Sequence, residues 1–220
     1  MRAAIYFTPP PGAPLTLAAA EWLGRDAFGS ATPPAPFPAQ TRSPRRYGFH
    51  ATIKAPFRLA EGRTLAALDQ ALAAFAASNP AVHLPALALA RLEGFFALVP
   101  AAPSPPLASL AASVVEGFEP FRAPLTKDEI AKRRPETLSA AARHNLERWG
   151  YPHVMDAFQF HMTLTDRVAD QDAGGVESEL RARFGPFIGQ PLAVDGLAVF
   201  TEPLPGADFA VHALHPLRAG

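Results

Sequence analysis

Two stretches of the chain, Phe49-His50-Ala51-Thr52-Ile53 and Phe160-His161-Met162-Thr163-Leu164, share one order: phenylalanine, histidine, a spacer, threonine and a branched aliphatic residue. Successive side chains of a β-strand point to opposite faces of its sheet. A strand would therefore place histidine and threonine on one face and the apolar residues on the other. In a helix, residues two apart point about 200° away from each other, so they could not serve one ligand. We predict that both His-Thr stretches are amphipathic strands.

The elements around the two His-Thr stretches repeat in the same order. Each half has a His-Thr strand, a helix and then two strands, at about 47–99 and about 158–214, and a helical connection at about 105–150 joins them. The repeat is one of element order, because the halves share negligible identity outside the two stretches. It predicts an α+β fold, a single bilobal domain spanning 1–220. Two pseudo-symmetric lobes of mainly antiparallel sheet with packed helices would face each other across a cleft.

Hydrophobic spacing and capping residues define the expected elements. Strands are expected at 2–8, 47–54, 82–90, 94–99, 158–165, 192–201 and 208–214. Helices are expected at 16–23, 65–77, 107–118 and 175–184. A further helix is expected to begin after 126, to break at 135 and to resume from there to 149. The clearest start signal is Thr126 with Glu129, which form a capping box.

Composition and charge limit the class of protein. The 220 residues are 49% hydrophobic, and 20 basic residues balance 20 acidic ones. A protein that binds nucleic acid backbones is usually more basic, so RNA is disfavoured as a partner. The sequence has no cysteine, which excludes disulfides, thiolate metal sites and cysteine nucleophiles. No apolar run approaches the roughly 18 residues that a membrane span needs, so we expect a cytoplasmic protein without a membrane partner. The sequence does not indicate an oligomeric state.

The paired histidines allow two interpretations. Polar residues facing outward from two half-buried strands would give the same pattern without chemistry. Alternatively, two imidazoles, which titrate near 6.5, supply a general acid and a general base near neutral pH. The two threonine hydroxyls would then donate to phosphate oxygens. The motifs typical of nucleotide loops, serine nucleophiles and zinc proteases do not occur, and we expect neither a metal nor another cofactor.

The His-Thr stretches resemble the His-x-Thr-hydrophobic signatures of the two-histidine (2H) phosphoesterase superfamily, which includes RNA 2′,3′-cyclic phosphodiesterases. Residues 46–57 and 148–152 more specifically resemble a bacterial branch often encoded beside phosphonate-utilisation genes. The resemblance implies an active-site cleft between two lobes. It also implies the roles of four residues: an acid/base pair and two phosphate-holding hydroxyls, namely His50 and His161, and Thr52 and Thr163. Which histidine is the acid stays open.

Three further residues are candidates for substrate binding. Lys54 shares the face of His50 by strand parity. Arg46 belongs to a positive patch at 41–54 that contains no acidic residue, although a solvated loop would explain it equally well. Tyr6, on the first strand, would line the cleft.

Two other features are interpreted as structural. Acidic residues surround the basic run Lys132-Arg133-Arg134, so we expect it on a solvent-facing helix. Tyr47 is expected to pack at the start of its strand.

Two classes of function remain. The first is a metal-independent phosphoesterase that hydrolyses a small cyclic phosphate or phosphodiester. The resemblance makes a cyclic ribose phosphate linked to phosphonate metabolism a candidate, and an RNA 2′,3′-cyclic phosphate is its competitor. The second is a non-catalytic module that binds a phosphorylated ligand. The intact histidine pair favours catalysis, since binding alone does not need two groups that titrate near neutrality.

Overall fold

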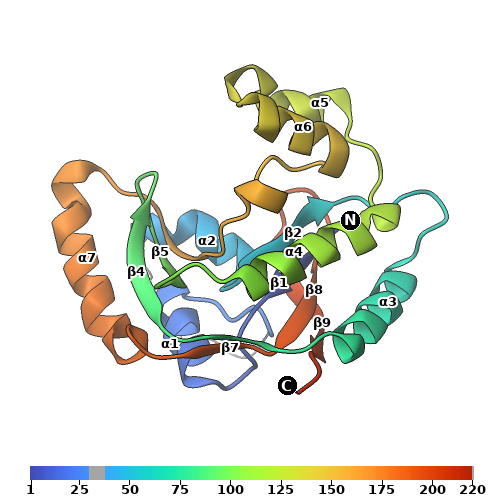
Figure 1. The fold of residues 1–220 in the computed structure, drawn as a ribbon. Helices are drawn as coiled ribbons and strands as arrows, with labels where there is room; N and C mark the ends of the chain where they lie inside the picture. Colours follow the sequence, from blue (N-terminus) through green and yellow to red (C-terminus); the bar gives the residue numbers. More distant parts are fainter. Residues whose placement is uncertain (30–37, 220) are drawn as a thin grey trace.

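The computed structural model describes residues 1–29 and 38–219 and has an α+β fold (Figure 1). The strands are β1 (Arg2–Phe7), β2 (Ala51–Phe57), β3 (Val82–Leu84), β4 (Leu87–Leu92), β5 (Phe95–Pro100), β6 (Met162–Arg167), β7 (Leu192–Val194), β8 (Gly196–Glu202) and β9 (Ala210–Pro216). The helices are α1 (Pro14–Leu23), α2 (Arg42–Tyr47), α3 (Leu65–Ser78), α4 (Pro105–Gly117), α5 (Lys127–Lys132), α6 (Ala140–Trp149) and α7 (Asp170–Phe184). The predicted α+β class with a mainly antiparallel sheet is confirmed.

One seven-stranded sheet runs through the molecule in the order β4-β5-β6-β2-β1-β8-β9, and each adjacent pair is antiparallel. The hairpin β4-β5 follows β2 in the chain, yet it pairs with β6. Strands β8 and β9 follow β6, yet they pair on the side of β1 and β2. The two halves of the chain therefore exchange strands and share a continuous sheet, instead of forming one sheet each. The short strands β3 and β7 make a separate two-stranded sheet.

Two of the predicted strands are each divided in the structure. The predicted strand 82–90 is interrupted at Pro85 and becomes β3 and β4, because proline has no N–H for a ladder hydrogen bond. The predicted strand 192–201 is interrupted at Asp195 and becomes β7 and β8. The same division in both halves lets the short first pieces pair with each other.

Local signals explain most helix boundaries. Thr64 accepts a hydrogen bond from Ala67 N–H and caps α3. Thr126 and Glu129 form the predicted capping box of α5. Gly150 ends α6 in the left-handed conformation, with φ of 75°, which glycine adopts without steric cost. Helix α2, in contrast, lies where a basic loop was expected, and its last residue leads into the first His-Thr stretch.

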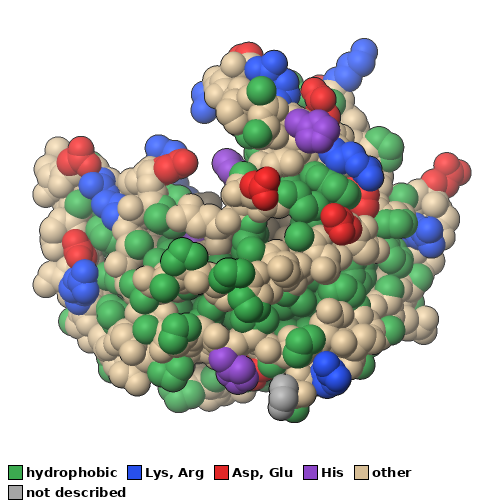
Figure 2. All heavy atoms as spheres, in the orientation of Figure 1, with side chains coloured by type: hydrophobic (Ala, Val, Ile, Leu, Met, Phe, Trp, Pro, Cys, Tyr) green, Lys and Arg blue, Asp and Glu red, His purple; other side chains and the backbone are tan. Residues whose placement is uncertain are grey.

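The two faces of the sheet differ in what covers them. Alternate residues of β1 point to opposite faces: Ile5 and Phe7 belong to the main core, whereas Ala4 and Tyr6 belong to a smaller cluster with Phe200. Helices α1, α3, α4 and α7 pack residues of their own into this main core. The second face therefore keeps room for a site. Helices α5 and α6 project from the body (Figure 1), and the surface is hollowed beside them (Figure 2).

Within the described ranges, no helix is both long enough and apolar enough to cross a membrane.

The core residue Leu164 on β6 provides a test of this packing. Its side chain is 0% exposed, and its carbonyl accepts a hydrogen bond of 2.8 Å from the indole N–H of Trp22 on α1. Leu164→Ala is expected to lower the free energy of unfolding by about 2–5 kcal/mol, because a buried leucine is replaced by a cavity. Leu204→Ala, at a position 70% exposed, is the control and should change it by less than about 0.5 kcal/mol. Urea denaturation measures both, and equal effects would contradict the packing.

Candidate active site

The register of β2 against β6 brings the two His-Thr stretches together. Among the described residues, Ala51 and Met162 are the one pair recorded between these strands. The predicted strands 47–54 and 158–165 begin later than expected, at Ala51 and Met162, so each histidine directly precedes its strand. Extending the antiparallel register of the one pair by a residue in each direction sets His50 against Thr163 and Thr52 against His161. Side chains directly opposite each other across strands lie about 4.5–5.5 Å apart at Cβ. Each histidine therefore has a threonine from the other half of the chain as its neighbour.

Both imidazoles are anchored in the same way. Nδ1 of His50 donates to the carbonyl of Gly48 (2.9 Å), and Nδ1 of His161 donates to the carbonyl of Gln159 (2.8 Å). A carbonyl oxygen only accepts hydrogen bonds, so the hydrogen of each neutral ring is on Nδ1. Nε2 is then the proton acceptor of both rings. The Nε2 atom of His50 lies 3.3 Å from the hydroxyl of Thr52, which can donate to it.

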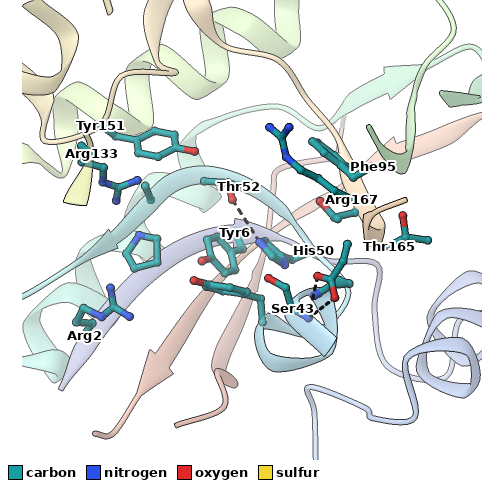
Figure 3. A pocket seen from close by; sticks show the side chains of 16 residues that line it. Arg2, Tyr6, Ser43, His50, Thr52, Phe95, Arg133, Tyr151, Thr165 and Arg167 are labelled. Carbon is teal, nitrogen blue, oxygen red and sulfur yellow. Dashed lines mark hydrogen bonds between the residues drawn. The ribbon is translucent and has the colours of Figure 1, made fainter. Parts of the chain in front are cut away.

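Two adjoining cavities receive these groups. His50, Thr52 and Thr163 line a cavity of about 370 Å³ (Figure 3). His161 lines a neighbouring cavity of about 190 Å³, and Thr52 lines both. Phe95 and Tyr151 are also shared by the two cavities. The four residues expected from the sequence thus lie around one pair of connected spaces.

Tyr6 holds the ring of His50 from one side. Their ring centroids are 3.9 Å apart with an angle of 22° between the planes, a stacked arrangement. Tyr6 is buried, packs against Phe200 and lines the larger cavity. The position expected for Tyr6 therefore agrees with the structure, and its contact with His50 is an addition. Stacking and the Nδ1 hydrogen bond together fix the orientation of this imidazole.

Burial lowers the pKa of both histidines. For His50 desolvation lowers the pKa to about 4, against the effect of the Gly48 carbonyl and with a further lowering by the charge of His161. For His161 desolvation also lowers the pKa, opposed by the Gln159 carbonyl. Both rings therefore favour the neutral form at pH 7 when no anion is bound. A bound phosphate would raise both pKa values, because an opposite charge nearby favours the protonated form.

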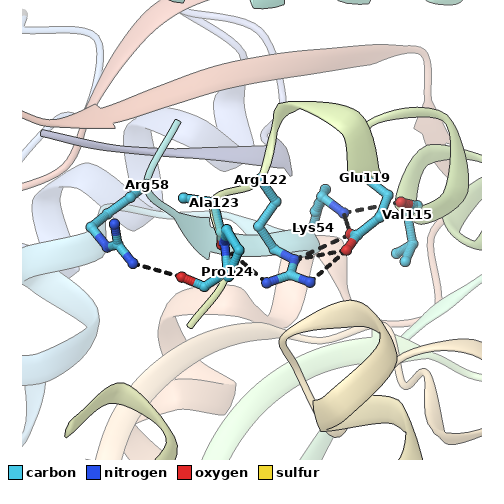
Figure 4. A network of polar contacts seen from close by, with 7 residues as sticks. All are labelled: Lys54, Arg58, Val115, Glu119, Arg122, Ala123 and Pro124. Atoms are coloured by element: carbon cyan, nitrogen blue, oxygen red, sulfur yellow. Dashed lines mark hydrogen bonds and ion pairs between the residues drawn. The ribbon is translucent and has the colours of Figure 1, made fainter. Parts of the chain in front are cut away.

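Lys54 does not lie in the cavity, contrary to the expectation from strand parity. Opposite β1, Thr52 pairs with Tyr6 but Lys54 pairs with Ile5, so β2 contains one extra residue, a β-bulge. The bulge turns Lys54 away from the cavity. Its ammonium group, 3% exposed, donates to the carbonyl of Val115 and to the carboxylate of Glu119, both at 2.9 Å (Figure 4). Lys54 is part of the scaffold.

Arg46, the second residue expected to bind substrate, also has its partners outside the cavity. Its guanidinium forms an ion pair with the buried carboxylate of Glu202 and donates to the carbonyl of Ala207 at 3.2 Å. Arg46 does not line the larger cavity. Arg2 shares the same carboxylate at 2.5 Å and does line it. Within the positive patch at 41–54, Arg46 is therefore neutralised by an acidic residue from the far end of the chain, and Lys54 by Glu119.

Several cavity residues were not expected from the sequence. Arg133, assigned to a solvent-facing helix, lines the cavity and lies over the ring of Tyr151, 4.9 Å from its centroid. Tyr47 packs on Phe209, with centroids 5.1 Å apart, but it ends α2 instead of starting a strand, and it lines the cavity as well. The remaining polar ones are Arg2, Ser43, Thr165, Asp166 and Arg167. Strand parity does put Thr165 on the face of His161, and Arg167 continues the same series, since both are an even number of residues from His161.

In the part of the chain that is described, no group of three or more histidine or acidic residues is placed to hold a metal ion.

Comparisons with known proteins place this chain in a family. Residues 52–210 match the family described as "Protein of unknown function (DUF1045)". The chain belongs to this family.

Two curated relatives are named "Ribose 1,5-bisphosphate phosphokinase PhnN". The one from Janthinobacterium sp. (strain Marseille) is 39% identical over 227 residues, which cover 94% of this chain and 49% of the relative. The one from Laribacter hongkongensis (strain HLHK9) is 36% identical over 217 residues, covering 95% and 50%. The chain spans about half the length of these relatives.

Solved structures resemble the whole chain of this DUF1045 protein. The protein TT0787 of Thermus thermophilus matches with a TM-score of 0.50 and 17% identity, over 100% of this chain and 99% of that one. A structure titled as a phosphoesterase matches with a TM-score of 0.44 and 14% identity. The structure of Escherichia coli LigT complexed with 3′-AMP matches with a TM-score of 0.43 and 12% identity. Each of these two matches covers 99% of this chain and 98% of the other chain. The similarity to TT0787 shows a shared fold.

The burial of His50 predicts how this residue titrates. Since its pKa is about 4 in the folded protein and near 6.5 in an unfolded chain, the unfolded chain binds the proton more tightly. The contribution of His50 to stability is therefore complete above about pH 6.5 and is lost as the pH falls through about 4. In an NMR titration without anions, the ring signals of His50, assigned with His50→Gln, should shift near pH 4. A midpoint at or above 6.5 would contradict this environment.

The scaffold role of Lys54 predicts a loss of stability without a loss of binding. Lys54→Met leaves Glu119 paired with Arg122, 2.5 Å away, so the cost should be about 1–3 kcal/mol, below the 3–5 kcal/mol typical of breaking a buried pair. Calorimetry should give the same affinity for inorganic phosphate as wild type. Lys132→Met, at an exposed position, is the matched control for stability. A large loss of phosphate affinity in Lys54→Met, but not in Lys132→Met, would instead show that Lys54 contributes to ligand binding.

Proposed function

We propose that this protein is a metal-independent phosphoesterase that opens a small cyclic phosphate ester by general acid/base catalysis with His50 and His161. The observation that carries the proposal is the matched geometry of the two rings. Each has Nδ1 anchored on a carbonyl two residues earlier, presents Nε2, and lies opposite a threonine of the other half. Binding alone would not need this arrangement twice.

The reaction follows from the positions of these groups. One neutral imidazole accepts a proton from water as the water oxygen forms a bond to phosphorus. The other imidazole, protonated at Nε2, donates a proton to the sugar oxygen as its bond to phosphorus breaks. Thr52 and Thr163 donate hydrogen bonds to the non-bridging oxygens, where negative charge develops. Each positioned acid or base typically contributes about 10²–10⁴-fold to the rate.

The surroundings of the two rings favour His50 as the base and His161 as the acid. His50 is held neutral by burial, and the charge of His161 lowers its pKa further. The ring that takes up a proton when a phosphate binds is then His161. Its protonation disfavours a second charge on His50, so one ring is neutral and the other is charged in the same complex. A bell-shaped dependence of kcat on pH is the expected consequence.

The names of the relatives support a phosphorylated ribose as the substrate. Both relatives are named as phosphokinases of ribose 1,5-bisphosphate, and this chain corresponds to about half of each. Opening a cyclic phosphate on ribose leaves a phosphate monoester on the sugar, which is the class of compound that such a phosphokinase acts on. A cyclic ribose phosphate linked to phosphonate metabolism therefore fits better than an RNA end, which the balanced charge of the chain disfavours.

The proposal predicts hydrolysis that does not depend on a metal and requires both histidines. Cyclic ribose phosphates, 2′,3′-cyclic nucleotides and RNA with a cyclic end are incubated with the protein, with and without EDTA. Turnover of a cyclic ribose phosphate should persist in EDTA. His50→Ala and His161→Ala should each lower kcat by at least about 10²-fold. His212→Ala, which removes an exposed histidine on β9, should retain wild-type turnover.

Two results would contradict the proposal. Loss of turnover in EDTA would point to a metal-dependent reaction. Binding of a cyclic phosphate without turnover, unchanged in both histidine variants, would favour the non-catalytic module instead.

A further inference from the structure

The larger cavity contains a cation whose charge is not balanced by an acidic residue. Three arginines line this cavity. Arg2 is paired with the buried carboxylate of Glu202, and Arg167 is paired with Glu93 at 3.3 Å. Arg133 has no ion pair with any residue that the structure describes, and its guanidinium contacts the ring of Tyr151. An arginine in this situation keeps its N–H donors available to an anion.

Arg133 and Tyr151 each follow one of the two helices of the projecting segment. Arg133 follows the last residue of α5, and Tyr151 follows Gly150, which ends α6. Gly150 has φ of 75°, and a Cβ at this position would lie 2.9–3.0 Å from the guanidinium of Arg122, so the turn that directs Tyr151 inward needs glycine. The hydroxyl of Tyr151 points toward the centre of the site, with Arg133 beside the ring (Figure 3).

These two residues come from a different part of the fold than the groups that surround the reacting phosphate, and Tyr151 also lines the cavity of His161. Thr52 and Thr163 lie on strands of the sheet and His50 directly precedes β2, whereas Arg133 and Tyr151 belong to the wall that the helical segment supplies. The two sets line the same cavity, of about 370 Å³. One ligand can therefore contact both sets, with its reacting phosphate at the sheet and a second group at the wall.

We infer that Arg133 and Tyr151 form a second anion subsite, which binds a phosphate monoester that the substrate carries in addition to its reacting phosphate. The planar guanidinium can donate two parallel hydrogen bonds to phosphate oxygens, and the ring of Tyr151 holds it in place by a cation–π contact. The Tyr151 hydroxyl supplies a further donor. The inference rests on the proposed function for the position of the reacting phosphate, and it makes Arg133 a residue that determines specificity.

Equilibrium binding tests the subsite without requiring turnover. Calorimetry at low ionic strength compares ribose 1,5-bisphosphate with ribose 1-phosphate, which lacks the second phosphate. The wild-type protein should bind the bisphosphate at least about tenfold more tightly, the size expected for hydrogen bonds to a charged group. Arg133→Gln should remove most of this preference, and Arg133→Lys should keep part of it. Tyr151→Phe should weaken bisphosphate binding and leave ribose 1-phosphate binding unchanged.

The neighbouring arginine provides the matched control. Arg134→Gln makes the same substitution one residue further on, at an exposed position outside the cavity, and should keep the full preference. Because the readout is a ratio of two affinities, a partly unfolded variant does not imitate the expected result. Absence of a preference in the wild-type protein, or an equal loss of it in Arg133→Gln and Arg134→Gln, would overturn the inference.

The same variants separate this inference from the proposed function. If Arg133→Gln loses the preference but no cyclic phosphate is turned over by the wild-type protein, the subsite stands and the phosphoesterase proposal fails. If cyclic phosphates are turned over but the affinity ratio is the same in wild type and Arg133→Gln, the phosphoesterase proposal stands and the subsite fails.

Discussion

The pairing of β2 with β6 is the contact on which the candidate site depends. It places the central residues of the two His-Thr stretches, Ala51 and Met162, side by side. This register has a direct chemical consequence. The histidine before each central residue is set against the threonine that follows the other central residue. A shift of one residue would turn the histidines and threonines of one stretch toward the helix-covered core. The exchange of strands between the halves fixes this register, since each half lies beside strands that come from the other.

Burial and local hydrogen bonding then decide what the two rings can do. The hydrogen bond from Nδ1 to a preceding carbonyl selects one tautomer for each histidine, and desolvation lowers both pKa values. A site of this kind disfavours positive charge until an anion enters, and the anion then favours protonation. Ligand binding and the protonation of the acid are therefore linked. The surroundings of the two rings differ as well, since Tyr6 stacks on His50, whereas His161 has a tilted contact with Phe95.

The sequence was sufficient for features that depend on short-range patterns. Period-two alternation predicted the faces of His50, Thr52, His161 and Thr163, and capping residues predicted the start of α5. The predicted position of Lys54 was wrong, because a β-bulge, which depends on the partner strand, changes the parity after Thr52. The ion pair of Arg46 was hidden because Glu202 is distant in the chain. Arg133 appeared solvated for a similar reason: its ring partner, Tyr151, is contributed by the far end of the helical segment.

A site built from two similar halves has to distinguish the two ends of its substrate. The strand pairing supplies a nearly symmetric set of two histidines and two threonines, which alone would accept a phosphate in either orientation. The asymmetry comes from residues that belong to only one half or to the connection between them. Tyr6 and Arg2 lie on β1, Arg133 lies between α5 and α6, and Tyr151 follows the end of α6. The bulged strand also contributes, because the ion pairs that join Lys54 to Glu119 and Glu119 to Arg122 tie β2 to the base of that segment (Figure 4). In the proposed reaction, the repeat thus supplies the pair of histidines, and the parts outside the repeat supply the orientation in which the pair would act.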